Sequence, residues 1–496
     1  MTRTEEQHTP AAGPAAEALG RVHFIGIGGV GMSAVARIMV ARGLPVSGSD
    51  AKDLPVMADL ASAGARICVG YDAVHLGDAQ TVVAGSAIRP DNPELAAARA
   101  AGLPVLHRSE ALAAVMAEDT AVTVAGTHGK STTTSMIAVL LQGAGMDPSF
   151  AIGANVPALG VNAASGSSPV FVAEADESDG SFLNYRPKIA VVTNVEPDHL
   201  DFYGTAEAVY ASFDRFTALL PADGVLVACA DDPGAKALAL RTRERGTTRV
   251  VLYGTGADAD FVLHDGGPGD VSISTPAGRF PLDLHVPGRH NALNAAAAFA
   301  VALELGVEPA LAAGALANFT GASRRFEFKG EGRGVRVYDD YAHHPTEVRA
   351  ALSAARTVAG GHQLHVLFQP HLFSRTREFA EEFAAALNTA DTALVLDIYP
   401  AREDPIPGVT SGLIAAHLGA GGRLVAAGAD AVQSIVSAAA PGDIVLTVGA
   451  GDVTAYGPLI VAALNDSSPY GASLNGASLN GASLNGAALN EGPDGA

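Results

Sequence analysis

Short apolar runs alternate with helical segments along most of this 496-residue chain. The run RVHFIGI (21–27) is typical of a buried strand, MSAVARIMVARG (32–43) of a helix, and VSGSD (46–50) of a second strand. The same alternation returns at TVVAG (81–85) and PELAAARAAG (93–102). Strands that alternate with helices predict an α/β fold built on parallel sheets.

The alternation falls into three blocks, which agrees with about 100–200 residues per domain. We expect three α/β domains, over residues 20–118, 119–322 and 323–465. Residues 1–19 are polar and rich in Ala, Pro and Glu, and residues 466–496 contain a GASLN repeat. Both ends are expected to be disordered, because segments of this composition bury too little apolar surface to offset the entropy of ordering.

The charge balance excludes some partners. The chain has 31 Lys and Arg against 52 Asp and Glu, a net charge of -21, whereas binding to nucleic acid or to an anionic membrane needs a basic surface. It has no signal-like apolar N-terminus and no run of about 18 apolar residues that would span a membrane. Its two cysteines, Cys68 and Cys229, lack metal-ligand spacing. We therefore expect a reduced, cytoplasmic protein.

The motif AGTHGKSTTTS (125–135) follows an apolar strand and opens a helix. Its glycines allow a tight turn whose N–H groups face a phosphate, Lys130 brings a cation to the β- and γ-phosphates, and Ser131 offers a hydroxyl to Mg²⁺. Val124 stands where a full Walker A motif has glycine. The motif thus predicts a shortened P-loop, with a plain glycine-rich turn as the alternative.

Two acidic segments follow later strands. EADESDGSF (174–182) places Glu174 at a strand end, where a carboxylate is a suitable Mg²⁺ ligand; a solvated acidic loop is the alternative. TNVEPDHLDFYG (193–204) places His199 among acidic side chains. A lone histidine is more often structural, but this polar setting favours a functional one.

The segment GRHNALNAAAA (288–298) opens a helix. His290 and Asn294 are four residues apart and share one helical face, from which they could reach a nucleotide base or phosphate. Ordinary capping by Asn291 is an equally good interpretation.

In the third block, YDDYAHHPTE (338–347) and FQPHLFSRTR (368–377) each follow a strand. Together they supply Asp340, Tyr341, His343, His344, His371, Arg375 and Arg377. An arginine fork can bind the carboxylate of an amino acid in a bidentate manner; a two-histidine metal site is the competing interpretation. Arg324 lies between the second and third blocks, at an expected hinge.

The segment GIGGVG (26–31) is a G-x-G-x-x-G motif after a strand, and Asp50 ends the next strand. Alone it indicates a dinucleotide-binding Rossmann domain, although the same turn can hold any diphosphate. A nicotinamide-dependent oxidoreductase is one alternative, but it does not explain the P-loop or the metal-type motifs. A silent nucleotide-binding scaffold is another, but it does not explain the ligand-type residues.

Taken in order, these motifs resemble the Mur ligase family, bacterial cytoplasmic ligases that build the peptide stem of peptidoglycan. The resemblance covers residues 20–465. The pieces GIGGVGMS, SAIRPDNPE (86–94), FYGTAEAVYASFDRF and DDYAHHPTE are most similar to the branch that adds L-alanine to UDP-N-acetylmuramate. Later-acting branches carry a carbamylated lysine after the metal-binding histidine, and here no lysine lies between Lys188 and Lys236. A ligase that recycles a murein tripeptide is the alternative within the family.

The resemblance implies an N-terminal Rossmann-like domain for the UDP-sugar, a central P-loop ATPase-type domain, and a C-terminal Rossmann-like domain for the amino acid. The implied UDP-sugar-binding residues are Gly26, Gly28, Gly29, Gly31, Met32, Asp50 and Ser86. The implied ATP-binding residues are Gly126, Thr127, His128, Gly129, Lys130, Ser131, Thr132, His290, Asn294 and Arg324. The implied Mg²⁺ ligands are Ser131, Glu174 and His199. The implied catalytic residues are Lys130, Glu174, His199, His343, His344, His371, Arg375 and Arg377.

The implied reaction consumes ATP. The substrate carboxylate attacks the γ-phosphate to give an acyl phosphate, which the amine of L-alanine then attacks to form an amide. Some relatives have an arginine where this chain has Leu372, so the carboxylate of L-alanine is left to Arg375 or Arg377. Three histidines, His343, His344 and His371, are candidates to accept the proton of the amine.

Overall fold

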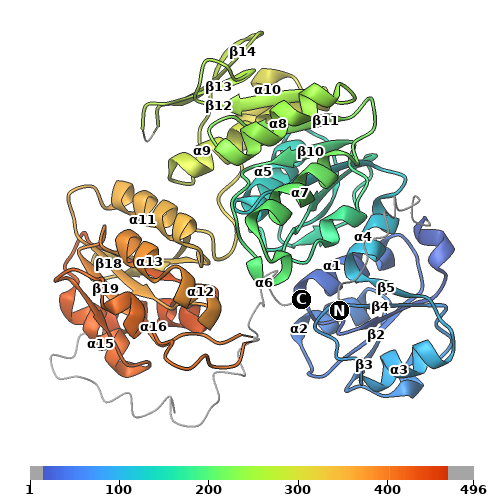
Figure 1. Cartoon of the computed structure of the whole chain (residues 1–496), viewed down its shortest axis with the longest axis horizontal. Coiled ribbons are helices and arrows are strands. Elements are labelled where there is room, and N and C mark those ends of the chain that lie inside the picture. The colour runs from blue at the N-terminus through green and yellow to red at the C-terminus, as the bar shows by residue number, and fades with distance from the viewer. Residues whose placement is uncertain (1–14, 268, 402, 467–496) are drawn as a thin grey trace. The chain divides into compact units, whose positions relative to one another are not determined.

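The computed structural model describes residues 15–267, 269–401 and 403–466. It contains three β-sheets, each from a separate stretch of the chain (Figure 1). The chain up to Asp283, together with Leu293–Phe319, makes one compact unit, and Leu284–Ala292 with the chain from Thr320 makes a second. The first unit holds two of the sheets and the second unit holds the third. The predicted α/β fold with three largely parallel sheets is confirmed.

The N-terminal sheet has five parallel strands in the order β3-β2-β1-β4-β5. Its strands are β1 (Val22–Ile25), β2 (Val46–Asp50), β3 (Arg66–Val69), β4 (Thr81–Ala84) and β5 (Val105–His107). Its helices are α1 (Val30–Ala41), α2 (Pro55–Ser62), α3 (Pro93–Ala100) and α4 (Arg108–Met116), with 3₁₀ turns η1 (Ala16–Leu19) and η2 (Ala73–Leu76). The strand order reverses between β1 and β4, and ligands of α/β sheets bind beyond the carboxyl ends of strands at such a reversal. The glycine motif follows β1 and Ser86 follows β4.

The prediction that residues 1–19 are disordered is wrong for their last part. Ala16–Leu19 form a 3₁₀ turn in which Ala16 and Leu19 are buried. The Thr81 hydroxyl donates to the carbonyl of Leu19 at 2.8 Å. An apolar contact and a buried hydrogen bond therefore order this short segment. The remaining segments expected to be disordered, residues 1–14 and 467–496, lie outside the described residues.

The central sheet has ten strands in the order β15-β14-β13-β12-β11-β10-β6-β9-β7-β8. Its strands are β6 (Thr120–Ala125), β7 (Ser149–Ala151), β8 (Ala163–Ala164), β9 (Val170–Glu174), β10 (Ile189–Val192), β11 (Val225–Cys229), β12 (Arg249–Gly254), β13 (Phe261–Asp265), β14 (Val271–Thr275) and β15 (Gly278–Pro281). Its helices are α5 (Lys130–Gly143), α6 (Leu200–Tyr203), α7 (Ala206–Thr217), α8 (Pro233–Arg245), α9 (Arg289–Glu304) and α10 (Pro309–Leu316), with the turn η3 (Ser181–Asn184).

The strand β6 lies between β9 and β10 and runs parallel to both. The carboxyl ends of these three strands therefore meet at one edge of the sheet, where the P-loop motif and both acidic segments begin. Sequence patterning did not indicate β7, β8 or β15, which are short and lie toward the two edges of the sheet.

The C-terminal sheet has six strands in the order β16-β17-β21-β18-β19-β20, and only β16 is antiparallel to its neighbour. Its strands are β16 (Glu327–Gly332), β17 (Val335–Asp340), β18 (Leu364–Phe368), β19 (Thr392–Val395), β20 (Gly422–Leu424) and β21 (Ile444–Val448). Its helices are α11 (Pro345–Ala359), α12 (Phe373–Glu378), α13 (Ala380–Leu387), α14 (Gly412–Ala415), α15 (Ala429–Ala438) and α16 (Tyr456–Asn465), with the turn η4 (Asp452–Ala455).

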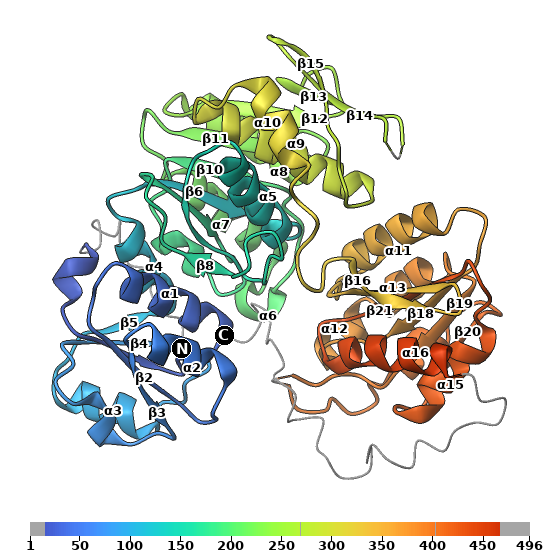
Figure 2. The same cartoon turned by 180° about the vertical axis from the view of Figure 1, so that it is seen from behind.

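Helices cover both faces of this C-terminal sheet (Figure 2). Val366 and Leu446 pack with residues of α11 and α13, whereas their strand neighbours Leu367 and Val445 pack with residues of α15 and α16. Successive side chains of a strand point to opposite faces, so the apolar runs seen in the sequence are those of a sheet buried on both sides.

Candidate functional site

The P-loop of the central sheet is held in place by the strand next to it. The Thr193 hydroxyl donates to the His128 carbonyl at 2.6 Å, and the Asn194 side chain both accepts from the His128 N–H at 2.8 Å and donates to its carbonyl at 2.9 Å. Gly126 has φ 135°, and a Cβ there would collide with Thr193. Only glycine allows this close approach, so the packing against Thr193 and Asn194 fixes the shape of the loop.

Lys130, the first residue of α5, directs its ammonium into the turn of the same loop. Its Nζ donates to the carbonyls of Gly126 at 3.0 Å and Thr127 at 3.3 Å, and it pairs with Glu177 at 2.8 Å. Burial works against the charge of Lys130, but Glu177 and Asp176 outweigh it and raise the pKa of the ammonium. The lysine therefore carries its positive charge at neutral pH.

Ser131 and Glu174 meet beside this lysine. The Ser131 hydroxyl donates to Glu174 Oε1 at 3.0 Å, and the Gly153 N–H donates to Glu174 Oε2 at 2.8 Å. Glu174 ends β9 and Ser131 opens α5, so adjacent elements bring a hydroxyl and a carboxylate oxygen together. Hard divalent cations such as Mg²⁺ prefer oxygen ligands of this kind.

His199 lies at the edge of the same acidic group. It caps the short helix α6 with φ 54°, in the left-handed region that non-glycine residues rarely adopt. Its Nε2 is 3.9 Å from Glu177 Oε1 and 3.7 Å from Asp198 Oδ2. A strained backbone at a buried histidine among carboxylates is typical of a functional position.

The remaining residues predicted to bind ATP divide between the two compact units. A Cβ on Gly129 would lie 2.9 Å from Asn294 Oδ1, so Asn294 contacts the P-loop within the first unit. His128 Nε2 is 3.5 Å from Glu196 Oε2, also within this unit. His290 belongs to the second unit, although it lies on the same helix α9 as Asn294. Thr127 and Thr132 lie in and just after the loop and are buried.

The glycine turn after β1 is held from behind by the end of β2. The N–H groups of Gly26 and Ile27 donate to the Ser49 carbonyl at 2.8 and 2.9 Å, and the Gly28 N–H donates to Asp50 Oδ2 at 3.0 Å. Gly29 caps α1, so this turn leads directly into a helix N-terminus that favours an anion. Asp50 therefore stabilises the glycine turn by accepting a hydrogen bond from it.

Two further residues predicted to contact the UDP-sugar flank this turn. Met32 is buried in α1, and Ser86 is exposed after β4. Ser86 Oγ lies 3.1 Å from His107 Nε2 and 3.5 Å from Asp179 Oδ2 of the central acidic loop. The N-terminal and central sheets therefore meet through polar side chains next to the two ligand-type loops.

The predicted histidines of the C-terminal unit gather at the carboxyl ends of β17 and β18. The rings of His343 and His371 are 5.9 Å apart, and His371 stacks on Tyr399 at 5.8 Å. His343 Nδ1 lies 3.3 Å from Glu347 Oε2. His344 caps α11, where its Nδ1 accepts from the Thr346 N–H at 3.4 Å. His344 therefore has a structural role that the sequence did not indicate.

The structure distinguishes the two arginines that the sequence left equivalent. Arg375 is 6% exposed and its Nη1 lies 3.5 Å from His371 Nδ1, whereas Arg377 is exposed on the same helix α12. Arg324, predicted to bind ATP, donates to the carbonyls of Gly449 at 2.6 Å and Gly451 at 3.1 Å and lies over the Tyr341 ring. Arg324 thus holds the loop after β21.

Asp340 ends β17 beneath these side chains. It accepts from the N–H groups of Phe326 and Ala342, both at 2.8 Å. Burial raises the pKa of Asp340 to about 6, although Arg325 and these two N–H groups oppose the rise. Its carboxylate therefore fixes the start of the histidine segment.

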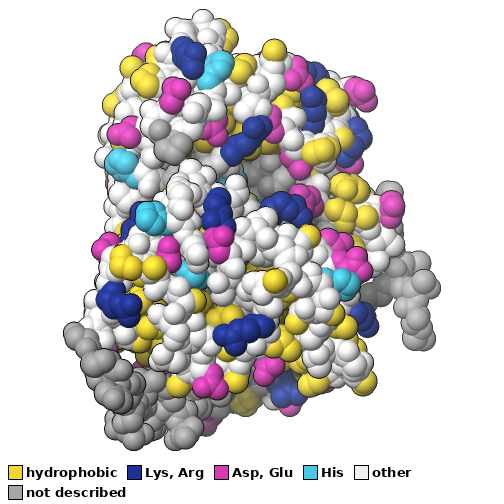
Figure 3. Space-filling view, turned by 90° about the vertical axis from the view of Figure 1, so that its left-hand side faces the viewer, with side chains coloured by type: hydrophobic (Ala, Val, Ile, Leu, Met, Phe, Trp, Pro, Cys, Tyr) yellow, Lys and Arg dark blue, Asp and Glu magenta, His cyan; other side chains and the backbone are white. Residues whose placement is uncertain are grey.

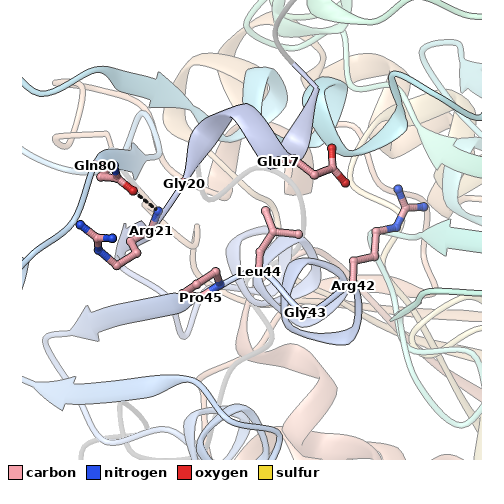
Figure 4. Close-up of a pocket in the computed structure, with 8 residues that line it drawn as sticks. All are labelled: Glu17, Gly20, Arg21, Arg42, Gly43, Leu44, Pro45 and Gln80. Atoms are coloured by element: carbon pink, nitrogen blue, oxygen red, sulfur yellow. Dashed lines mark hydrogen bonds between the residues drawn. The ribbon is translucent and has the colours of Figure 1, made fainter.

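A hollow of about 300 Å³ in the N-terminal domain lies away from these loops (Figure 4). Leu44 and Pro45, which line it, precede β2, so the hollow lies at the amino edge of the sheet. Of the two guanidinium groups beside it, Arg21 pairs with Asp78 at 2.9 Å and Arg42 with Asp119 at 2.8 Å. Both guanidinium groups beside the hollow are therefore already neutralised by carboxylates.

The surface carries both signs of charge. On the face shown in Figure 3, Lys and Arg side chains are interspersed with Asp and Glu rather than gathered into one basic patch. Within the described ranges, every helix is too short or too polar to cross a lipid bilayer.

Sequence reasoning missed several residues that build the site. Thr193 and Asn194 hold the P-loop, Glu177 pairs with its lysine, and Arg108 packs against Gly31. Thr193, Asn194 and Glu177 lie within motifs that the sequence did reveal, and Arg108 lies outside them, but each acts through a partner far away in the chain. Spacing within one motif carries no signal for such contacts.

Three family models match consecutive parts of the chain. They are described as the Mur ligase family, catalytic domain, over residues 21–120; the Mur ligase middle domain, over residues 124–302; and the Mur ligase, glutamate ligase domain, over residues 324–451.

The chain is also similar to individual proteins. The UDP-N-acetylmuramate–L-alanine ligase of Arthrobacter sp. (strain FB24) is 82% identical over 92% of this chain and 97% of that protein. The protein of the same description from Renibacterium salmoninarum is 65% identical over 90% and 96%. The crystal structure of the UDP-N-acetylmuramate-alanine ligase from Thermotoga maritima has a TM-score of 0.71 at 29% identity, covering 90% of this chain and 100% of that one.

Proposed function

Because this chain belongs to the Mur ligase family, we propose that it joins L-alanine to UDP-N-acetylmuramate with consumption of ATP, in peptidoglycan synthesis. The products are UDP-N-acetylmuramoyl-L-alanine, ADP and phosphate. The observation that carries this proposal is the 82% identity to an alanine-adding ligase over 97% of that protein. Since ATP and UDP-sugars are cytoplasmic metabolites, we also propose the cytoplasm as its compartment.

We propose that the UDP diphosphate binds at the glycine turn of the N-terminal sheet. The turn offers backbone N–H groups at the start of α1, the geometry with which α/β sheets hold diphosphates. Arg108 lies against Gly31 and would add a cation to the same site. Ser86 of the N-terminal domain contacts Asp179 of the central acidic segment, so the sugar would extend toward the central sheet.

ATP would bind at residues 126–132, with Asn294 beside the loop. Lys130 supplies a fixed positive charge for the transferring phosphoryl group, which matters because phosphoryl transfer depends on positioning and electrostatic stabilisation. The hydroxyl of Ser131 and the carboxylate of Glu174 are suitable ligands for Mg²⁺, and His199 lies nearby for a second ion. Mg²⁺, when bound, would neutralise negative charge on the phosphate oxygens.

The lactyl carboxylate of the sugar attacks the γ-phosphate and gives an acyl phosphate and ADP. The neutral amine of L-alanine then attacks the acyl carbon, and the tetrahedral intermediate collapses to an amide and inorganic phosphate. We propose that Arg375 binds the carboxylate of L-alanine, because it is buried next to His371 whereas Arg377 is exposed. His343 and His371 are the candidates to accept the amine proton, since His344 is used as a helix cap.

The test is phosphate release from ATP and Mg²⁺ with UDP-N-acetylmuramate, each amino acid being supplied singly. Stimulation by L-alanine, with an amide-linked UDP product in the mass spectrum, is the expected result. Release only with a murein tripeptide would instead favour the recycling reaction; the murein peptide ligase of Psychrobacter arcticus has a TM-score of 0.66 at 25% identity over 90% of this chain and 99% of that one. Release with none of these amines would contradict both.

A further inference from the structure

The ammonium of Lys130 is surrounded by oxygen atoms of the protein. Its Nζ lies 3.0 Å from Glu177 Oε1 and 2.8 Å from Glu177 Oε2, and it also donates to the carbonyls of Gly126 and Thr127. An ammonium has only three N–H donors. The lysine therefore has no spare donor for a phosphate unless it gives up one of these partners.

Glu177 is the partner whose loss matters most, because it carries the compensating charge. The Lys130 side chain is 11% exposed and that of Glu177 is 2% exposed. Burial raises the pKa of the Glu177 carboxyl, and the adjacent Lys130 ammonium opposes that rise. A buried ion whose partner is removed is strongly destabilised, so each of these two charges depends on the other. The Glu177 backbone is itself fixed, since the Tyr203 hydroxyl donates to its carbonyl at 2.5 Å.

We propose that Glu177 is an internal counter-anion of Lys130, and that ATP binding exchanges this carboxylate for phosphate oxygens. The inference rests on the proposed ATP site. Glu177 competes with the nucleotide for one cation, which lowers the affinity for ATP while keeping the empty loop stable. It is a positioning residue, because it acts through Lys130 rather than on the substrate.

Glu174 provides a matched control from the same acidic segment. Both are glutamates near the P-loop, Glu174 half-buried and Glu177 buried. Glu174 accepts from Ser131 and Gly153, whereas Glu177 pairs with the lysine. Removing the charge of Glu174 leaves the competitor of Lys130 in place. The two substitutions should therefore differ in their effect on a nucleotide that binds without metal.

The experiment measures the binding of ATP in EDTA by isothermal titration calorimetry, so that no Mg²⁺ bridges the acids and the phosphates. We expect Glu177→Gln to bind metal-free ATP about tenfold more tightly than the wild-type protein, because the lysine no longer has an anionic competitor. Glu174→Gln should change this affinity by less than about threefold, since it tests only the general repulsion between an acid and the phosphates. Equal or weaker binding by Glu177→Gln would overturn the proposal.

The Lys130→Met background tests whether the effect passes through the lysine. In that background Glu177→Gln should raise the affinity for metal-free ATP by less than about twofold, because no cation remains to be released from its carboxylate. An equal increase in ATP affinity in both backgrounds would mean that Glu177 only repels the phosphates. It would contradict the proposal that phosphate oxygens replace Glu177 at Lys130.

A folding control keeps the proposal testable if Glu177→Gln is unstable. Glu177→Asp retains the charge but withdraws the carboxylate from Lys130 by one methylene. It should raise the affinity for metal-free ATP by about threefold. An unchanged affinity would count against the proposal. Failure of the proposed function is separable from these outcomes: the wild-type protein would then fail to bind ATP even with Mg²⁺ present.

Discussion

The first two sheets each begin with a parallel strand, a glycine turn and a helix, but the two turns are equipped differently. At Gly26–Gly31 the turn is held by a backbone carbonyl and by Asp50, and it presents N–H groups to a ligand. The P-loop adds the ammonium of Lys130 and the carboxylate of Glu174. On the proposed assignment of the UDP diphosphate to the first turn and ATP to the second, the phosphate that is transferred meets more fixed charge than the one that is only recognised.

The largest effect should follow from removing the lysine of the second turn. Lys130→Met should lower ligase activity by about 10³-fold, since the charge of the transferring group is no longer neutralised. Phosphate release would measure this. Binding of UDP-N-acetylmuramate to the first turn should stay within about twofold of wild type. Parallel loss of sugar binding would contradict the separation of the two turns.

Glu174→Gln should have the next largest effect. We expect a loss of about 10²-fold in activity and a higher Mg²⁺ concentration at half-maximal rate, because a carboxylate ligand becomes a neutral amide. A Mg²⁺ titration of the rate gives both quantities. Glu207→Gln, an exposed acid on α7, is the control and should leave both unchanged. An unaltered Mg²⁺ requirement in Glu174→Gln would show that this carboxylate does not hold the metal.

The C-terminal unit offers a second charged site, the one proposed to bind the carboxylate of L-alanine. Arg375→Lys should raise the KM for L-alanine by about 30-fold, because a lysine cannot reproduce the bidentate fork. Arg377→Lys, on the exposed side of the same helix, should change it by less than about twofold. Steady-state kinetics at saturating ATP and sugar separate the two variants. A larger increase in the KM for L-alanine in Arg377→Lys than in Arg375→Lys would mean that Arg377 binds the carboxylate of L-alanine.

The first turn should respond to a change of shape that displaces the arginine beside it. A Cβ at Gly31 would lie 2.9 Å from Arg108 Cδ and would displace that side chain. We expect Gly31→Ala to raise the KM for the UDP-sugar by about tenfold and to leave the KM for ATP unchanged. Gly314→Ala is the control, since nothing lies within 4 Å of its added Cβ. An increase in both KM values would mean that the turns are not independent.

The smallest effect concerns stability beneath the first turn. Burial works to raise the pKa of Glu94, but hydrogen bonds from His23, Ser49 and His75 outweigh it and hold the pKa below 4.5, its ordinary value. Because the folded pKa is depressed, this stabilisation is present above pH 4.5 and is lost as the pH falls through the folded value. Glu94→Gln should therefore lower the free energy of unfolding by about 1 kcal/mol at neutral pH.

Urea unfolding of the wild-type protein and Glu94→Gln at neutral pH, and again at about pH 3.5, measures this difference. The gap between the two proteins should narrow at the lower pH. Equal stability at neutral pH would show that the network under the turn contributes nothing.

Much of the fold could be predicted because both faces of the sheets are buried. Continuous apolar strands such as β6 and β21 stand out in the sequence, and glycines mark the turns that follow them. The short edge strands β7 and β8 could not be predicted, since three and two residues hold too little pattern. Residues 16–19 were predicted to be disordered because composition cannot reveal that Leu19 is buried against the sheet.

The candidate site was predictable only as far as single motifs carry chemistry. Lys130, Ser131 and Glu174 lie together as their motifs predict, because β6 and β9 are neighbours in the sheet. The partnership of Lys130 with Glu177 depends on how two loops fold over each other. Likewise, nothing in the spacing of Arg375 and Arg377 shows which one the helix buries.

The central claim is that the lactyl carboxylate of the UDP-sugar bound at the first turn is phosphorylated by the ATP bound at the second turn. UDP-N-acetylmuramate labelled with oxygen-18 in its lactyl carboxylate, together with ATP, Mg²⁺ and L-alanine, tests it directly through the mass of the released phosphate. Transfer of a labelled carboxylate oxygen to each phosphate formed is the predicted result, because the acyl phosphate loses that oxygen when the amine attacks. Unlabelled phosphate formed together with the amide product would contradict the account.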